Sequence, residues 1–152
     1  MKKLLLISAL SAIALTGCRS DDDQPLPTTI PNATVGVWNP SSFKVYSGTD
    51  HTTLLSTTAA NACYQLSIFE FLANGNVVTT LSDLDISGIC QVSTPETLPY
   101  TYNAQAKTLT VDDEVMRVKT LTANVFEFEV GDYLNDDNND GVQDIMYITL
   151  VR

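Results

Sequence analysis

The chain has 152 residues, with 8 Lys or Arg against 18 Asp or Glu and a formal net charge of -10. This acidic excess argues against a nucleic-acid partner, because such binding depends on neutralising phosphates with basic side chains. It also argues against an electrostatic grip on anionic lipid headgroups.

The first 17 residues have the pattern of a secretory signal. Lys2 and Lys3 precede an apolar run from Leu4 to Leu15, which is a basic region followed by a hydrophobic region. This run is much shorter than the roughly 20 residues that a bilayer-spanning helix needs. We therefore expect residues 1–17 to be cleaved off and not retained as a membrane span.

Cys18 follows directly at the expected cleavage site. The segment Leu15 to Cys18 resembles the bacterial lipobox, in which the cysteine thiol takes a diacylglycerol and the new amino group is then acylated, for example with palmitate. The alternative is an ordinary secretory signal with a chance cysteine. Lipidation at Cys18 would hold the mature chain on a membrane, because stable anchoring takes more than one acyl chain.

Residues 18–33 are predicted to form a flexible tether. An acidic cluster, Asp21–Asp23, lies directly behind Cys18, and three prolines follow among polar residues, a composition typical of an extended linker. Lipoproteins of the Bacteroidetes type carry a similar tract, and this resemblance implies display on the outer leaflet of the outer membrane. A solvated spacer on the periplasmic face is the alternative. The folded domain is expected to cover residues 34–152.

The domain reads as short strands separated by turn residues, with little helical periodicity. A first strand is expected from Thr34 to Tyr46, with a kink at Pro40, and a short helix around Leu54 to Ala60. Ala73–Asn76 is a strong hairpin signal, because Asn and Gly tolerate the positive φ of tight turns. The other strand candidates are residues 64–72, 77–81, 100–103, 108–111, 114–119, 125–130 and 145–151; the stretch 83–94 is less regular.

The strand at residues 125–130 shows the clearest alternation of apolar and charged side chains. Phe126 and Phe128 face one way, and Glu127 and Glu129 face the other, as in a half-buried antiparallel strand. About eight such strands in successive hairpins predict an all-β fold. A small antiparallel up-and-down barrel is the leading architecture, because closure removes free strand edges, and an open sandwich is the alternative.

Two cysteines remain once Cys18 is lipidated. Cys63 and Cys90 would lie in a compartment where disulfides persist, which favours one bridge over two free thiols. A zinc site is disfavoured, since His51 is the only histidine of the chain and zinc needs several nitrogen or sulfur ligands.

The order of several short motifs resembles the lipocalin-like domains of small bacterial lipoproteins. These motifs are Gly36-Val37-Trp38, the hairpin Phe71–Gly75, the strand Lys107–Val111, the end Leu150–Arg152, and the two cysteines. The resemblance implies a barrel in which Trp38, two residues after Gly36, packs at the floor against an arginine. Arg152 fits that role and Arg117 is a second candidate, with a cation-π contact expected. The domain is shorter than the usual carriers and lacks their Thr-Asp-Tyr turn, so a deep pocket is not implied.

An acidic segment from Asp136 to Asp144 has the spacing of a calcium loop. It offers side-chain oxygens at alternating positions, a glycine at the sixth position and a backbone carbonyl at the seventh. The predicted ligands are Asp136, Asn138, Asp140, Val142 and Asp144. Tyr147 replaces the bidentate Glu of an EF-hand, which excludes that motif. A hairpin loop without an ion is the alternative.

No catalytic constellation stands out. His51 is expected to be solvated, Asp112 to Glu114 to mark a turn, and the chain has no nucleophile elbow or phosphate loop. We therefore expect a non-enzymatic lipocalin-like binding domain on the cell envelope, with a small apolar ligand in its barrel. The alternative is a structural module that meets a surface protein or glycan through its acidic, calcium-stabilised loop.

Overall fold

The computed structural model describes residues 33–131 and 133–152. The predicted signal peptide and the lipidation of Cys18 lie outside these residues, as does all of the tether but Ala33. Within the described part of the chain, no helix is long and apolar enough to cross a membrane.

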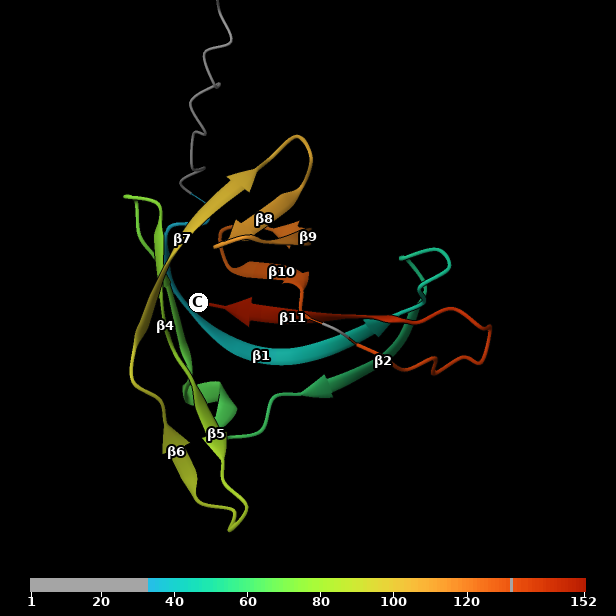
Figure 1. The fold of residues 1–152 in the computed structure, drawn as a ribbon, viewed down its shortest axis with the longest axis horizontal. Coiled ribbons are helices and arrows are strands. Elements are labelled where there is room, and N and C mark those ends of the chain that lie inside the picture. Colours follow the sequence, from blue (N-terminus) through green and yellow to red (C-terminus); the bar gives the residue numbers. More distant parts are fainter. Residues whose placement is uncertain (1–32, 132) are drawn as a thin grey trace, which may run out of the picture.

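Eight antiparallel strands close into a barrel within the described residues (Figure 1). Each strand pairs with the next in the order β1-β3-β4-β7-β8-β9-β10-β11, and β11 pairs back onto β1. The strands are β1 (Gly36–Tyr46), β3 (Ile68–Phe71), β4 (Asn76–Thr80), β7 (Glu96–Asn103), β8 (Thr108–Val111), β9 (Glu114–Leu121), β10 (Val125–Glu129) and β11 (Ile145–Val151). The predicted all-β barrel is therefore confirmed.

The long strand β1 pairs with different strands along its length. Its first residues, Gly36–Trp38, pair with β3, whereas Ser42–Tyr46 pair on the same side with β2 (Leu54–Ala59). The register with β11 shifts between Pro40 and Ser42, where proline cannot donate a ladder hydrogen bond. Beyond this irregularity at Pro40, β1 pairs with β2 in place of β3 while it stays paired with β11, and β2 extends the sheet as a ninth strand.

Two sequence-based predictions in this region were wrong. Leu54 to Ala60 is not a helix but contains β2, because its two threonines suit a strand and β1 offers an unpaired edge. Residues 64–72 do not form one strand, since a short 3₁₀ helix, η1 (Tyr64–Leu66), precedes β3. The Asn61 side chain accepts a hydrogen bond from the Tyr64 backbone N–H at 2.8 Å, which favours that turn.

A small hairpin projects from the end of the barrel below β4 (Figure 1). It consists of β5 (Ser82–Leu84) and β6 (Cys90–Val92), in the stretch expected to be irregular. A disulfide joins Cys90 of this hairpin to Cys63, directly before η1, with a Cα–Cα distance of 5.5 Å. The predicted bridge is present, and it ties the hairpin to the segment that leads into β3.

The barrel interior is the hydrophobic core. Its fully buried side chains come from opposite walls, with Trp38 on β1, Phe71 on β3, Leu109 on β8, Phe126 on β10 and Leu150 on β11. Phe126 contacts both Trp38 and Phe71, with ring centroids 5.6 and 5.4 Å apart. The aromatic cluster therefore links strands that are distant in sequence.

Candidate functional site

The floor of the barrel is closed by Trp38 and Arg152. The guanidinium carbon of Arg152 lies 4.1 Å from the centroid of the Trp38 ring, so Arg152 makes the contact that the resemblance implies. The second candidate, Arg117, lies instead against Glu129. The Trp38 indole N–H donates to the Thr34 backbone oxygen at 2.9 Å. Arg152 also donates to the backbone oxygen of Val35 at 2.7 Å. Arg152 thereby holds the segment that leads into β1, residues 33–35, against the end of β11.

Gly36 is needed at this floor for two reasons. Its φ of 135° lies in a region that other residues rarely adopt. A Cβ atom placed on Gly36 would also lie 2.5 Å from Nη1 of Arg152, so that a side chain there would have to displace this guanidinium from its place over Trp38. Gly36, Trp38 and Arg152 therefore form one packed unit.

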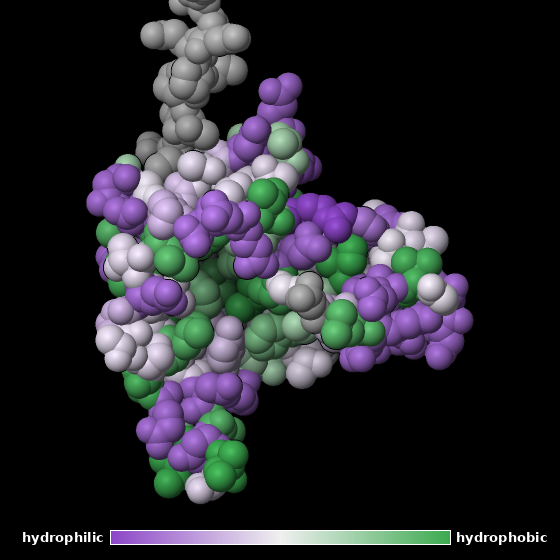
Figure 2. All heavy atoms as spheres, in the orientation of Figure 1, coloured by the Kyte–Doolittle hydropathy of each residue, from purple (hydrophilic) through white to green (hydrophobic). Residues whose placement is uncertain are grey.

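The barrel retains an apolar cavity of about 190 Å³ away from the floor. Aromatic and aliphatic side chains line it, and Glu114 is the one charged residue among them; the others are Phe69, Phe71, Val77, Thr79, Leu109, Val111, Met116 and Phe128. Figure 2 shows apolar side chains in a hollow of the face that it presents. The barrel is thus partly filled by its own side chains and partly open.

A buried polar cluster lies on the outer face of the barrel, over β10 and β1. Glu127 on β10 is only 2 % exposed, although its alternation with Phe126 and Phe128 places it outside the barrel. Its carboxylate pairs with Lys44 at 2.5 Å and accepts a hydrogen bond from the Tyr46 hydroxyl at 3.0 Å. Burial, with the hydrogen bond to Glu127, raises the pKa of Tyr46 to about 12.

The acidic segment after β10 is joined to the β1–β2 loop, residues 47–53. The Asp144 carboxylate accepts backbone N–H groups from Gly48 at 3.1 Å and from Asp137 at 2.6 Å. The Thr49 hydroxyl donates to Asp140 at 2.7 Å, and this hydrogen bond lowers the pKa of Asp140. A Cβ on Gly48 would lie 1.8 Å from the backbone oxygen of Gln143, so the two segments fit closely only with glycine there.

The predicted calcium ligands adopt a turn held by their own backbone. The Asp136 carboxylate accepts from the N–H groups of Asp140 and Gly141, at 3.0 and 2.8 Å. Asn138 accepts from Asp140 at 3.1 Å. Within residues 33–131 and 133–152, no three His, Cys, Asp or Glu side chains are grouped so that they could hold a metal ion. Calcium binding through these residues and the Val142 carbonyl stays a prediction.

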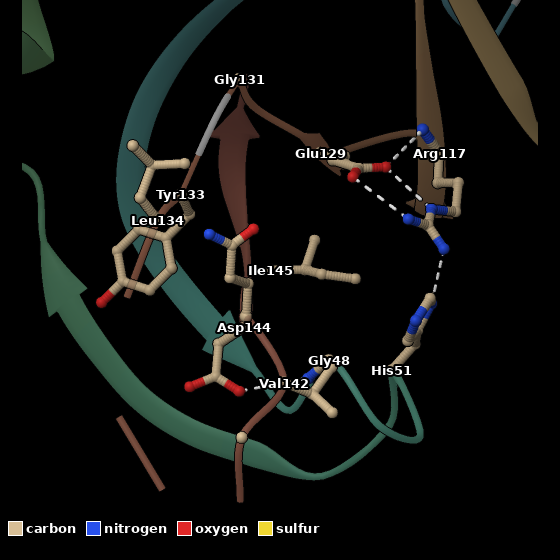
Figure 3. Close-up of a pocket in the computed structure, with 12 residues that line it drawn as sticks. Gly48, His51, Arg117, Glu129, Gly131, Tyr133, Leu134, Val142, Asp144 and Ile145 are labelled. Atoms are coloured by element: carbon tan, nitrogen blue, oxygen red, sulfur yellow. Dashed lines mark hydrogen bonds and ion pairs between the residues drawn. The ribbon is translucent and has the colours of Figure 1, made fainter. Parts of the chain in front are cut away.

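A cleft of about 530 Å³ opens between the acidic segment, the β1–β2 loop and the outer faces of β9 and β10. On one side of it, Arg117 donates from Nε to Glu129 at 2.9 Å, and its Nη1 lies 2.6 Å from Nδ1 of His51 (Figure 3). This hydrogen bond to Glu129 raises the pKa of Arg117. Tyr133 and Leu134 lie across the cleft from these side chains.

Sequence reasoning missed this cleft. His51 is not simply solvated, as expected, but contacts Arg117 and accepts a hydrogen bond from Lys119 at its backbone oxygen, 2.8 Å away. No local motif joins His51 to β9, because the contact spans 66 residues of chain. Asp112, in contrast, lies in the β8–β9 turn as predicted, with a φ of 53°.

Comparison with known proteins agrees with this architecture. The family model described as "Lipocalin-like domain" matches residues 34–128, which is more than half of the chain. No similar curated protein and no similar solved structure was found.

Proposed function

Because the chain belongs to the lipocalin-like domain family, we propose that it is a non-catalytic binding protein that takes up a small apolar molecule in its barrel. The observation that supports this proposal is the cavity of about 190 Å³ among aromatic and aliphatic side chains. Apolar cavities of about 150 Å³ are large enough to hold one benzene-sized molecule. The ligand should therefore be a single ring or a short acyl segment.

The lining chemistry also defines how that ligand would bind. Phe69, Phe128 and Met116 offer apolar contact, so that binding depends on the transfer of apolar surface out of water. Glu114, an exposed residue of the lining, would favour a ligand that keeps a polar end in solvent. A charged ligand without such an apolar part is disfavoured, because its desolvation would not be compensated.

Titration of the purified full chain with benzene and with hexan-1-ol tests the barrel site. The methyl NMR signals of Val77 and Leu109 should shift saturably. Val111→Phe, which fills part of the cavity, should weaken binding by about tenfold, or ~1.4 kcal/mol. Val115→Phe is the matched control, because Val115 lies on the next strand and is 65 % exposed. Equal binding by the two variants would place the ligand elsewhere.

We propose further that lipid on Cys18 holds the domain on the outer membrane, facing the cell surface. The lipobox-like segment before Cys18 and the acidic tract after it support this location. Cys18→Ala should abolish incorporation of labelled palmitate and release the protein from the membrane fraction. Protease added to intact cells should remove the domain if it is surface-displayed, whereas full protection would place it on the periplasmic face.

A second candidate function is an interaction module that meets a surface protein or glycan. The cleft of about 530 Å³ beside the acidic segment favours it, because this space lies outside the barrel and has a polar wall of its own. Calcium would stabilise the segment that forms its border. This function requires no barrel ligand.

A further inference from the structure

We propose that the outer cleft binds one neutral sugar unit of a glycan. The binding wall would be formed by Arg117 on β9, Glu129 on β10 and His51 in the β1–β2 loop. This inference rests on the second candidate function and is independent of the barrel ligand, because none of these three residues lines the barrel cavity.

The wall offers hydrogen-bond donors and acceptors side by side. Arg117 always donates, so the 2.6 Å contact from its Nη1 requires His51 to accept at Nδ1 and to carry its proton on Nε2. Nε and Nη2 of Arg117 engage the two oxygens of Glu129 at 2.9 and 3.3 Å. One N–H on each Nη atom, the His51 Nε2–H and further lone pairs of Glu129 then remain for a ligand. Sugar hydroxyls need this mixture, because each can donate and accept.

The wall is organised before any ligand arrives. His51 has a φ of 58°, a conformation that few residues other than glycine adopt and that often marks a functional position. Lys119 holds the loop there by donating to the His51 backbone oxygen at 2.8 Å, while its ammonium lies 3.7 Å from the centroid of the Tyr46 ring. A pre-organised wall lowers the entropic cost of binding a flexible hydroxylated ligand.

The opposite side of the cleft is more apolar. Tyr133 and Leu134 lie across from His51 and Arg117, and Val142, 43 % exposed, lies along its lower border (Figure 3). The Tyr133 hydroxyl donates to Asp137 at 2.7 Å, which fixes the ring within the acidic segment. A ligand with hydroxyls on one side and a C–H face on the other would match these two walls.

Charge decides against an anion. Glu129 already neutralises Arg117 through the ion pair at 2.9 Å, Asp144 borders the same cleft, and the chain carries a net charge of -10. A carboxylate or phosphate would therefore meet repulsion that a neutral sugar avoids. The volume of about 530 Å³ falls in the range of small-molecule sites and has room for one sugar ring with its linkage.

The test is an NMR titration of the purified full chain with the methyl α-glycosides of glucose, galactose and mannose and with N-acetylglucosamine. At least one should give saturable shifts at His51, the Arg117 side chain and the Val142 methyls, with a Kd in the millimolar range typical of a single sugar unit. Sodium acetate and inorganic phosphate at matched ionic strength should leave these signals unchanged.

Two variants locate the binding. Glu129→Gln should weaken the response at least tenfold, whereas the same change at the exposed Glu96 on β7 should not alter it. His51→Asn, which keeps a residue tolerant of positive φ, should also weaken it and serves if Glu129→Gln destabilises the fold. Saturation by the anions alone, no saturation by any glycoside, or unchanged binding in His51→Asn would overturn the proposal. A calcium-dependent rise in stability without glycoside binding would overturn the sugar assignment but leave the interaction function standing.

Discussion

At the middle of β10 and β11, the inner and outer faces are both buried but chemically opposite. Inside the barrel, Phe126 and Ile148 are 0 % and 1 % exposed; outside it, Glu127 and Thr149 are 2 % and 7 % exposed. The alternation along β10 correctly predicts which side chains share a face. It does not predict that the charged face is also removed from water. Alternation therefore predicts to which side of the sheet a side chain points, but not whether that side is buried.

The outer face is stable because its polar atoms are paired across strands. Glu127 binds Lys44 and Tyr46 from β1 and accepts a hydrogen bond from the Thr149 hydroxyl at 3.3 Å. Within the described residues, no buried side-chain nitrogen or oxygen lacks a hydrogen-bond partner. The inner face depends instead on apolar contact, as the 4.9 Å separation of the Phe126 and Phe128 rings illustrates. The two faces should therefore respond differently to substitution.

The largest effect is expected from the inner face. Phe126→Ala removes the ring that contacts Trp38 and Phe71, and should lower the free energy of unfolding by about 3–5 kcal/mol. Chemical denaturation measures this change. Val115→Ala, at an exposed position, should stay within about 0.5 kcal/mol of the parent protein. Comparable losses in both variants would mean that the barrel core is not packed as described.

The disulfide lies outside both faces and serves as an independent reference. Cys63→Ser and Cys90→Ser should each lower stability by roughly 3 kcal/mol, because both remove the same cross-link between residues 27 apart. Substitutions on the inner or outer face of β10 should change the free energy of unfolding by the same amount with and without the disulfide, because the effects of distant sites are usually additive. In the parent protein, both thiols should resist alkylation until reduction.

The outer face should be sensitive to loss of a single partner. Glu127→Ala leaves Lys44 and the Tyr46 hydroxyl without their carboxylate, and should lower the free energy of unfolding by about 2–3 kcal/mol. The double change Glu127→Leu with Lys44→Met should recover part of that loss, because it removes both charges of the pair. A double variant less stable than Glu127→Ala would show that packing, and not charge pairing, dominates this face.

Alkaline pH should weaken the outer face selectively. The pKa of Tyr46 is raised from 10.0 to about 12 by burial and by the hydrogen bond to Glu127. A folded-state pKa above the unfolded value means that this stabilisation is complete below pH 10 and is lost as the pH rises toward 12. The melting temperature should therefore fall over that range, and Tyr46→Phe should make the fall less steep. Burial also raises the pKa of Tyr147, so some alkaline sensitivity should remain.

The smallest expected effect concerns calcium at the acidic segment. Without a bidentate acid at the twelfth position, affinity should be about 10⁻⁴ M or weaker, so the melting temperature should rise slightly between chelator and a few millimolar calcium. Asp136→Asn combined with Asp140→Asn should abolish this rise, and Gly141→Val should act similarly, because Gly141 has a φ of 85°. Identical melting curves in both conditions would mean that the segment binds no calcium and is only an acidic loop hydrogen-bonded to Gly48 and Thr49.

The local and periodic features of this protein could be predicted from its sequence. Alternation located most strands, and Asn74 and Gly75 indicated the hairpin between β3 and β4. The order of the short motifs carried the resemblance that paired Trp38 with Arg152. These features were readable because short-range sterics, the period of two and ordered motifs are written along the chain. The disulfide followed from the number of cysteines and the expected compartment.

The burial of the outer residues and the contacts between distant loops depend on the tertiary structure and could not be predicted in this way. The strand β2 forms because β1 offers an unpaired edge beyond Pro40, and the local sequence of Leu54–Ala59 does not reveal that edge. His51 meets Arg117, and Glu127 meets Lys44, across separations of 66 and 83 residues. Such contacts depend on barrel closure and on the change of strand partner along β1, which bring together segments whose local sequence carries no sign of one another.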